Sequence, residues 1–214
     1  HMTTGYGMTE TSPVSTQTRV DDPVEKRVAT VGPVHPHVEV QIVDPETGRL
    51  LPRGQSGELC TRGYSVMLGY WNMPEATAEA TRGGWMHTGD LATMDDDGYV
   101  SIVGRIKDII IRGGENIYPR EIEEYLYTHP LIEDAQVIGV PSDTYGEEVM
   151  AWIKVKRGSS VSADALQAFC KGQIATYKIP HFWKLVDSFP MTVTGKIQKF
   201  RMRELSVEEL GRQP

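Results

Sequence analysis

The pattern of hydrophobic and polar residues in the first half of the chain, up to about residue 105, is typical of short strands separated by turns. A period of two over 38–43 is typical of a half-buried strand, and the turn-forming residues 44–48 end it. Gly98 follows three aspartates between two further runs of this kind, which predicts a hairpin. Pro74 fits the first turn of a short helix from Glu75 to Thr81. The strands expected here are 38–43, 57–62, 91–94 and 99–103. This half is therefore predicted to be rich in β-structure.

From residue 106 onward the pattern alternates between strands and helices. Ile122, Tyr125 and Leu126 fall on one face of a helix that begins at Pro119, and Pro130 follows its end. We expect strands at 109–111, 116–118, 134–140, 148–155 and 182–186, and further helices over about 162–173 and from about 198. The whole chain is therefore predicted to have an α+β fold.

Composition and charge narrow the kind of ligand. The chain has 214 residues, of which 39% are hydrophobic and 24% charged, which excludes a disordered or collagen-like protein. Its net charge of −7 argues against nucleic acid as the main partner. The second half is less acidic than the first and contains a basic cluster at Lys196, Lys199, Arg201 and Arg203. These charges favour a small anionic ligand over a polymer.

The two cysteines, Cys60 and Cys170, are 110 residues apart and have no CxxC or Cys/His spacing, so the sequence predicts neither a zinc site nor a disulfide framework. A reducing cytoplasmic compartment fits this pattern. No apolar run approaches 18 residues, so no transmembrane segment is predicted. His1-Met2 is typical of a cloning remnant, and the remaining sequence starts at Thr3 within a predicted loop. We therefore expect a truncated chain.

Three familiar ligand motifs do not fit. Gly5-Tyr6-Gly7 lacks the third glycine and the preceding strand of a dinucleotide fingerprint. Gly195-Lys196 is followed by Ile197, where a phosphate-binding P-loop needs serine or threonine. Aspartates 95–97 resemble the start of a calcium loop, but Gly104 stands where the bidentate glutamate would be, so they are read as a turn.

Six polar clusters remain. They are Tyr6-Gly7-Met8-Thr9-Glu10-Thr11, Gly57-Glu58-Leu59 with Arg62-Gly63, Trp85-Met86-His87-Thr88-Gly89-Asp90-Leu91, Gly104-Arg105-Ile106-Lys107-Asp108, Arg112-Gly113-Gly114-Glu115-Asn116-Ile117-Tyr118-Pro119 and Pro190-Met191-Thr192-Val193-Thr194-Gly195-Lys196-Ile197. Each alone is typical of a turn or a solvated loop. In this order they resemble the adenylate-forming ligase superfamily (AMP-binding enzymes), which comprises acyl-CoA synthetases, carrier-protein adenylation domains and luciferases. The resemblance extends from Gly5 to about Leu205.

The resemblance implies a nucleotide site in the first half. Tyr6 would stack on adenine, Thr9 would hydrogen-bond the α-phosphate, and Glu10 would hold Mg²⁺ that bridges the ATP phosphates. Asp90 would accept both ribose hydroxyls and Arg105 would reach the same ribose. Without the resemblance, Tyr6 would be a turn aromatic, Thr9 and Glu10 part of a helix cap, Asp90 a turn residue and Arg105 a surface cation.

The resemblance also implies roles in the second half. Lys107 matches a hinge on which a small C-terminal domain pivots. Lys196 matches the lysine that reaches the carboxylate and the α-phosphate during adenylation, although alone it would be an exposed lysine before a helix. Gly113 and Gly114 would line the tunnel for the pantetheine arm of CoA, because glycine lets the backbone approach a slender ligand closely.

Residues 113–119 look most like fatty- and medium-chain acyl-CoA synthetases. The implied reaction adenylates a carboxylic acid with ATP and Mg²⁺ and then transfers the acyl group to CoA. Two alternatives stay open. One is an adenylation domain that loads a carrier protein, and the other is a non-catalytic module that binds a nucleotide or a partner.

The chain departs from the family in what it lacks. The Ser/Thr/Gly-rich phosphate loop that ends in Pro-Lys-Gly is absent, and so is the acyl pocket, which precedes Gly5 in the family. We therefore expect residues 3–106 to be the β-rich end of the large AMP-binding domain, a portion of its distorted antiparallel barrel. Residues 108–214 would be the small C-terminal domain, with an antiparallel sheet and flanking helices. This chain alone should be inactive, hold no cofactor tightly, and self-associate through exposed apolar surface.

Overall fold

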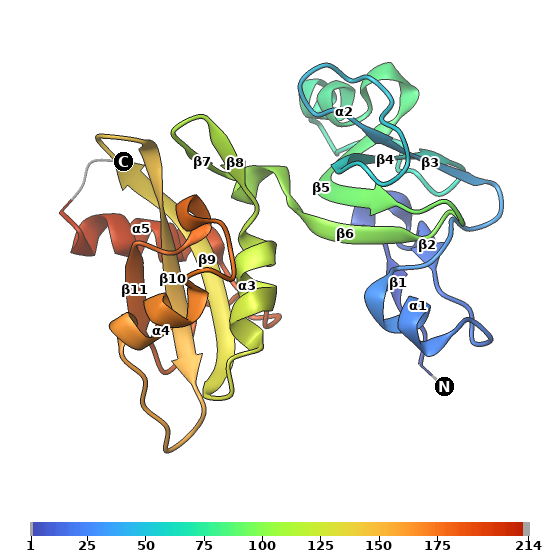
Figure 1. Ribbon diagram of the computed structural model, residues 1–214. Coiled ribbons are helices and arrows are strands. Elements are labelled where there is room, and N and C mark those ends of the chain that lie inside the picture. Colours follow the sequence, from blue (N-terminus) through green and yellow to red (C-terminus); the bar gives the residue numbers. More distant parts are fainter. Residues whose placement is uncertain (1, 212–214) are drawn as a thin grey trace. The chain divides into compact units, whose positions relative to one another are not determined.

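A computed structural model describes residues 2–211, and the chain divides between Lys107 and Asp108 into two compact units (Figure 1). Each unit has its own hydrophobic core. The first unit contains short helices and antiparallel strands, and the second a sheet with helices on its faces. The structure is of the predicted α+β class.

The first unit is built on an antiparallel sheet in the order β3-β4-β5-β6. Its strands are β1 Gly5–Tyr6, β2 Thr16–Gln17, β3 Val38–Val43, β4 Gly57–Gly63, β5 Met86–Met94 and β6 Val100–Arg105, and its α-helices are α1 Val24–Ala29 and α2 Pro74–Ala80. Short 3₁₀ turns lie at Thr9–Thr11, Arg82–Gly84 and Ile106–Asp108. Within residues 2–211, β3 and β6 are the edges of this sheet, so it is open and does not close into a barrel.

The core of the first unit lies on one face of this sheet. Ile42, Leu59, Ala92 and Val100 are buried there, and each comes from a different strand. The predicted strands and the hairpin around Gly98 are confirmed, and Gly98 has a φ of +86°. Helix α1 was not predicted, because its six residues are too few to show a helical period, and Val24 and Val28, which share one face, are both exposed.

The second unit has three layers. Its elements are β7 Ile110–Arg112, β8 Glu115–Ile117, α3 Pro119–Tyr127, β9 Ile132–Ser142, β10 Gly146–Val155, α4 Ala163–Cys170, a 3₁₀ turn at Thr176–Lys178, β11 Phe182–Leu185 and α5 Lys199–Glu209. Strand β10 is central, because β9 and β11 pair with it and its first residue pairs with the end of β7. The sheet is mixed and not wholly antiparallel, since β11 runs parallel to β10. The connection through α4 makes this possible, because parallel neighbours need a long crossover.

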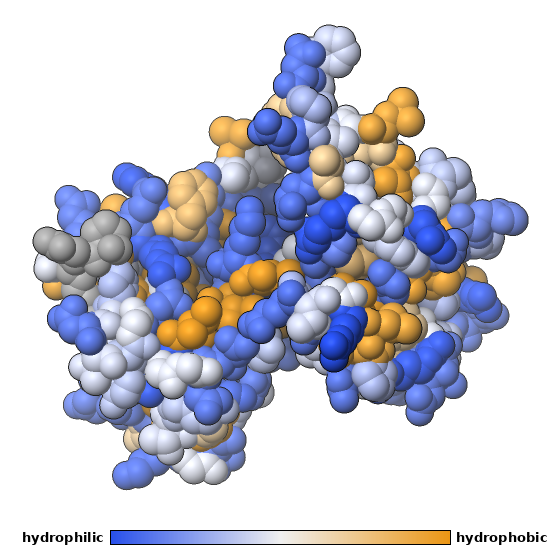
Figure 2. Space-filling view, turned by 90° about the horizontal axis from the view of Figure 1, so that it is seen from above, coloured by the Kyte–Doolittle hydropathy of each residue, from blue (hydrophilic) through white to orange (hydrophobic). Residues whose placement is uncertain are grey.

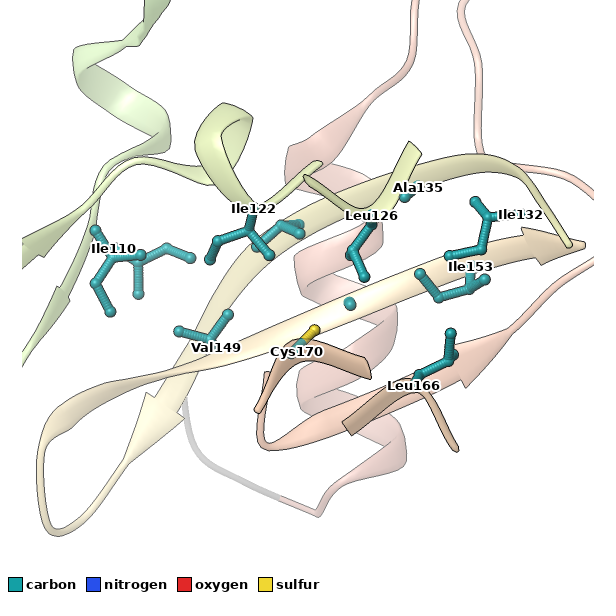
Figure 3. Packing of buried hydrophobic residues seen from close by; sticks show 12 residues of the cluster. Ile110, Ile122, Leu126, Ile132, Ala135, Val149, Ile153, Leu166 and Cys170 are labelled. Carbon is teal, nitrogen blue, oxygen red and sulfur yellow. The ribbon is translucent and has the colours of Figure 1, made fainter. Parts of the chain in front are cut away.

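Alternation along β10 gives each face of this sheet a core. Val149, Ala151 and Ile153 lie on the side covered by α3 and α4, where Figure 3 shows the helix residues Ile122 and Leu126 near the sheet. Residues 150 and 152 face the opposite way, toward Met202 of α5 in a second cluster. A strand buried on both faces reads as a continuous apolar run, which is why its pattern was easily recognised.

Helix α4 ends three residues earlier than predicted. Ser162 caps its start by accepting a 3.2 Å hydrogen bond from the N–H of Ala165. At its end Lys171 is extended and Gly172 has a φ of +76°, which stops the helix after Cys170. The glycine was the local signal for this end.

The first unit exposes several large apolar side chains between β4 and α2. They are Tyr64, Leu68, Trp71 and Met73. Figure 2 shows hydrophobic side chains interrupting a mostly hydrophilic surface. Self-association through such surface stays a prediction. In the described part of the chain no helix is long and apolar enough to cross a membrane, and both cysteines are free and buried.

The packing of the second unit's core allows the effect of a substitution on stability to be predicted. Leu126 is fully buried in the cluster that α3 and α4 share. Replacement with alanine should cost about 2–5 kcal/mol of unfolding free energy, through lost burial and the cavity left behind. Val193→Ala is the control, because Val193 is fully exposed. Urea unfolding of both variants measures the difference, and equal stability would show that this core does not hold the unit together.

Candidate functional site

The carboxylate of Asp90 lies between two predicted nucleotide-binding residues. The Tyr6 hydroxyl donates to Oδ2 of Asp90 at 2.6 Å, and Nε of Arg105 donates to Oδ1 at 2.9 Å. Asp90 is largely buried, whereas most of the Arg105 side chain is exposed. These residues come from β1, β5 and β6, and Asp90 is paired with Arg105 across the sheet. The structure thus brings Tyr6, Asp90 and Arg105 together.

The backbone around Asp90 is fixed by the neighbouring strand. Thr88 donates its hydroxyl to the carbonyl of Leu59 at 2.7 Å and accepts the Asp90 N–H at 3.1 Å. Gly89 between them has a φ of +70°, which disfavours any residue with a side chain. This short irregular step turns the Asp90 carboxylate toward Tyr6. Thr88 was not singled out from the sequence.

Tyr6 is placed by an equally tight backbone approach. A Cβ on Gly7 would lie 1.5 Å from the carbonyl oxygen of Pro13, so only glycine fits after Tyr6. Burial, followed by the hydrogen bond to Asp90, raises the pKa of Tyr6 well above its ordinary value. The phenol is therefore a neutral donor, and its ring forms one side of the cluster.

Glu10 lies in the 3₁₀ turn that begins at Thr9, and a residue far along the chain positions it. The Tyr70 hydroxyl donates to Oε1 of Glu10 at 3.0 Å, and the backbone N–H of Met67 donates to the Glu10 carbonyl at 2.8 Å. Among the described residues Oε2 of Glu10 has no hydrogen-bond partner, so it is available to a ligand. Thr9 is exposed. Sequence reasoning missed Tyr70, which is separated from Glu10 by 60 residues.

A carboxylate oxygen of this kind suits Mg²⁺, which prefers oxygen ligands and keeps several waters. The partly exposed position of Glu10 leaves room for such waters. The donor set therefore fits the ion that the sequence resemblance implies.

Gly113 and Gly114 form the two-residue tip of the β7–β8 hairpin. Their φ values are +59° and +88°, and Arg112 pairs with Glu115 across the turn. Two positive φ angles are what such a tight hairpin requires, so the turn itself explains both glycines. A Cβ on Gly114 would meet no atom within 4 Å, which leaves space beside it.

Lys196 lies at the end of a separate tight turn in the second unit. The backbone of Thr192 pairs with that of Lys196 at 2.8 Å, and the Thr192 hydroxyl accepts the Lys196 N–H at 3.1 Å. Gly195 has a φ of +80°. The Lys196 side chain is exposed, as is that of Lys107, the last residue of the first unit.

Two sequence models of one protein family match successive parts of the chain. The sequence model of the AMP-binding enzyme family matches residues 1–71, and that of the AMP-binding enzyme C-terminal domain matches residues 121–196. These are successive parts of one family of proteins, and together they cover most of the sequence. The chain belongs to the AMP-binding enzyme family.

Curated relatives carry acyl-CoA ligase names. The chain is 57% identical over 208 residues to YngI of Bacillus subtilis, a candidate acyl-CoA synthetase by name, covering 97% of this chain and 38% of YngI. It is 50% identical to the mitochondrial medium-chain acyl-CoA ligase ACSF2 of Bos taurus, covering 96% of this chain and 34% of that protein. The chain thus spans little more than a third of the length of these relatives.

Solved structures agree with the fold. ATP-bound MatB from Rhodopseudomonas palustris superposes with a TM-score of 0.92 at 39% identity, covering 98% of this chain and 41% of MatB. The amide bond synthetase McbA from Marinactinospora thermotolerans gives 0.86 at 36% identity, covering 95% of this chain and 42% of McbA.

The raised pKa of the buried Tyr6 hydroxyl predicts that the free energy of unfolding depends on pH. The pKa of Tyr6 is higher in the folded chain than in the unfolded chain, where it is about 10. The protonated hydroxyl therefore stabilises the folded state fully below about pH 10, and this contribution is lost as the pH rises toward the folded-state pKa. The unfolding free energy of the wild-type chain should therefore exceed that of Tyr6→Phe at pH 8, and the gap should narrow above pH 10. Urea unfolding across this range measures the gap. A constant gap would show that Tyr6 titrates normally.

Proposed function

We propose that the protein containing this chain is an AMP-forming acyl-CoA ligase for fatty or medium-chain carboxylic acids. The observation that carries the proposal is the Asp90 carboxylate held between Tyr6 and Arg105. Each carboxylate oxygen keeps a lone pair beyond the bond it accepts, so both can receive ribose hydroxyls. The ring of Tyr6 then offers a stacking surface for adenine.

In the first half-reaction the carboxylic acid attacks the α-phosphorus of ATP and pyrophosphate leaves. Asp90 and Arg105 fix the ribose, and the Thr9 hydroxyl hydrogen-bonds the α-phosphate. Glu10 would hold Mg²⁺, which would neutralise charge on the phosphates. Lys196 contributes an ammonium group to the charge that develops during attack.

In the second half-reaction the thiol of CoA displaces AMP from the acyl-adenylate. Gly113 and Gly114 border the pantetheine arm in this proposal, and the free space beside Gly114 supports that role. Lys107 serves as the hinge between the steps, which the exposure of its side chain at the end of the first unit supports.

A full-length hybrid tests the proposal. This chain would replace the matching segment of YngI, to which it is 57% identical. Acid-dependent exchange of pyrophosphate into ATP, followed by acyl-CoA formation, is expected across a panel of fatty acids. Transfer of the acyl group to an amine or a carrier protein in place of CoA would contradict the proposal that CoA is the acceptor. A folded hybrid without pyrophosphate exchange would contradict the assignment as a ligase. This chain alone is the blank.

Lys196 and Gly114 should affect different half-reactions in this hybrid. Lys196→Ala should slow adenylation by about 10²–10³, the cost of removing one preorganised charge donor, and spare CoA transfer from a supplied acyl-adenylate. Gly114→Leu should have the reverse effect. Lys171→Ala controls for an exposed lysine, and Gly158→Leu controls for strain at a glycine with positive φ and open space. Equal losses in both steps would contradict the separate roles.

Tyr70 should increase the affinity for Mg²⁺ by positioning Glu10. Its hydroxyl orients the carboxylate, so Tyr70→Phe leaves Glu10 free to rotate while keeping the ring. In the hybrid, the Mg²⁺ concentration for half-maximal exchange should rise about tenfold or more, with little change at saturating Mg²⁺. Tyr64→Phe is the control, because that side chain is exposed. A loss that saturating Mg²⁺ does not restore would point to a structural role.

A further inference from the structure

Three side chains with metal-binding atoms meet on β4 and β5, and none of them has been assigned to the nucleotide. They are Glu58, Cys60 and His87, and their ligand atoms all lie within 4.8 Å of one another. The Cys60 Sγ lies 3.4 Å from Nδ1 of His87, and the same nitrogen lies 2.7 Å from Oε2 of Glu58. One nitrogen is thus shared by a thiol and a carboxylate.

Strand geometry explains why these residues meet. Glu58 and Cys60 are two positions apart on β4, so their side chains share one face of the sheet. Cys60 is paired directly with His87 on β5, and a bulge follows between Cys60 and Glu58. The hydrophobic core around Leu59 lies on the opposite face. The sequence concealed this cluster, because the cysteine and the histidine are 27 residues apart in an unrelated spacing.

We infer that Glu58, Cys60 and His87 form a binding site for a thiol-seeking divalent cation such as Zn²⁺. Zinc bonds of about 2.3 Å to sulfur and 2.0–2.2 Å to nitrogen and oxygen place tetrahedral ligand atoms about 3.4–3.6 Å apart. The sulfur-to-nitrogen distance already matches. The nitrogen-to-oxygen distance must open by less than about 1 Å, which a glutamate side chain achieves by rotation about its own bonds.

The cluster is enclosed, as a metal site requires. Glu58 and Cys60 are buried, and the His87 side chain is only 12% exposed, so the ion would exchange water for protein ligands on one side. Zinc binds a thiolate and an unprotonated imidazole nitrogen, so two protons must move. The Cys60 proton leaves for solvent as the Zn–S bond forms, and the proton between Nδ1 of His87 and Glu58 is released, so that the neutral imidazole keeps its proton on Nε2. Solvent supplies the fourth ligand.

Arg82 competes with the ion. One of its terminal nitrogens, NH2, lies 3.2 Å from the same Glu58 oxygen that the metal would use, and 44% of the Arg82 side chain is exposed. The guanidinium can therefore swing into solvent when a cation enters. Oε1 of Glu58 keeps a different contact, to the N–H of Gly89 at 3.1 Å, so binding at Oε2 need not disturb the backbone next to Asp90.

Cobalt titration of the purified 214-residue chain tests the inference. One equivalent of Co²⁺ should give thiolate-to-metal charge-transfer absorption, and Zn²⁺ should displace it. Cys60→Ala should abolish the absorption, whereas Cys170→Ala, the matched change at the second buried cysteine, should keep it. No absorption in the wild-type chain, or absorption that depends on Cys170, would overturn the site.

Two further variants keep the test decisive if Cys60→Ala does not fold. Glu58→Gln should weaken Zn²⁺ binding about tenfold by removing a ligand charge. Arg82→Gln should strengthen it about tenfold, because a competing cation is removed without touching a ligand. Zinc should also raise the melting temperature of the wild-type chain, since it binds only the folded state. Unchanged or weaker binding in Arg82→Gln would refute an ion beside Glu58.

Discussion

The Thr88 hydroxyl of β5 links the backbone of β4 to that of Asp90 by two hydrogen bonds, and the candidate nucleotide site depends on them. The carbonyl of Leu59 receives the Thr88 hydroxyl, which in turn accepts the Asp90 N–H. Leu59 itself is fully buried in the core of the first unit. The direction of the Asp90 carboxylate is therefore set by core packing one strand away, and this gives Tyr6 and Arg105 a fixed anion to bind.

Much of the fold could be predicted because it follows local rules. Period-two alternation located β3, proline marked the starts of α2 and α3, and glycine marked the hairpin tips at Gly98 and Gly113. Helix α1 has only six residues, too few for a helical period to be recognised, so the sequence carried no comparable signal for it. The parallel pairing of β11 with β10 is a long-range choice that strand pattern alone cannot reveal.

The site was predictable to a different degree. Tyr6, Asp90 and Arg105 were named from motifs, and the structure brings them together. Tyr70 and Thr88 were missed because a single tyrosine or threonine is common, and its meaning comes only from the distant partner it contacts. The same holds for the cluster at Glu58, where pairing across a sheet replaces the short spacing by which metal sites are usually recognised.

Strand β5 therefore contributes residues to two polar clusters, three positions apart. His87 points to Cys60 and Glu58, whereas Asp90, three residues on, points to Tyr6. Residues 87 and 90 are three positions apart, so regular alternation along a strand would put their side chains on opposite faces. The pairing of β5 with β4 shifts register between them, and Gly89, with its positive φ, lies at this shift. Glu58 is the link, since one of its oxygens holds the Gly89 N–H while the other meets His87. A single buried carboxyl group thus stabilises the irregular step that presents Asp90, and these hydrogen bonds explain how an acidic side chain fits a position with almost no solvent contact.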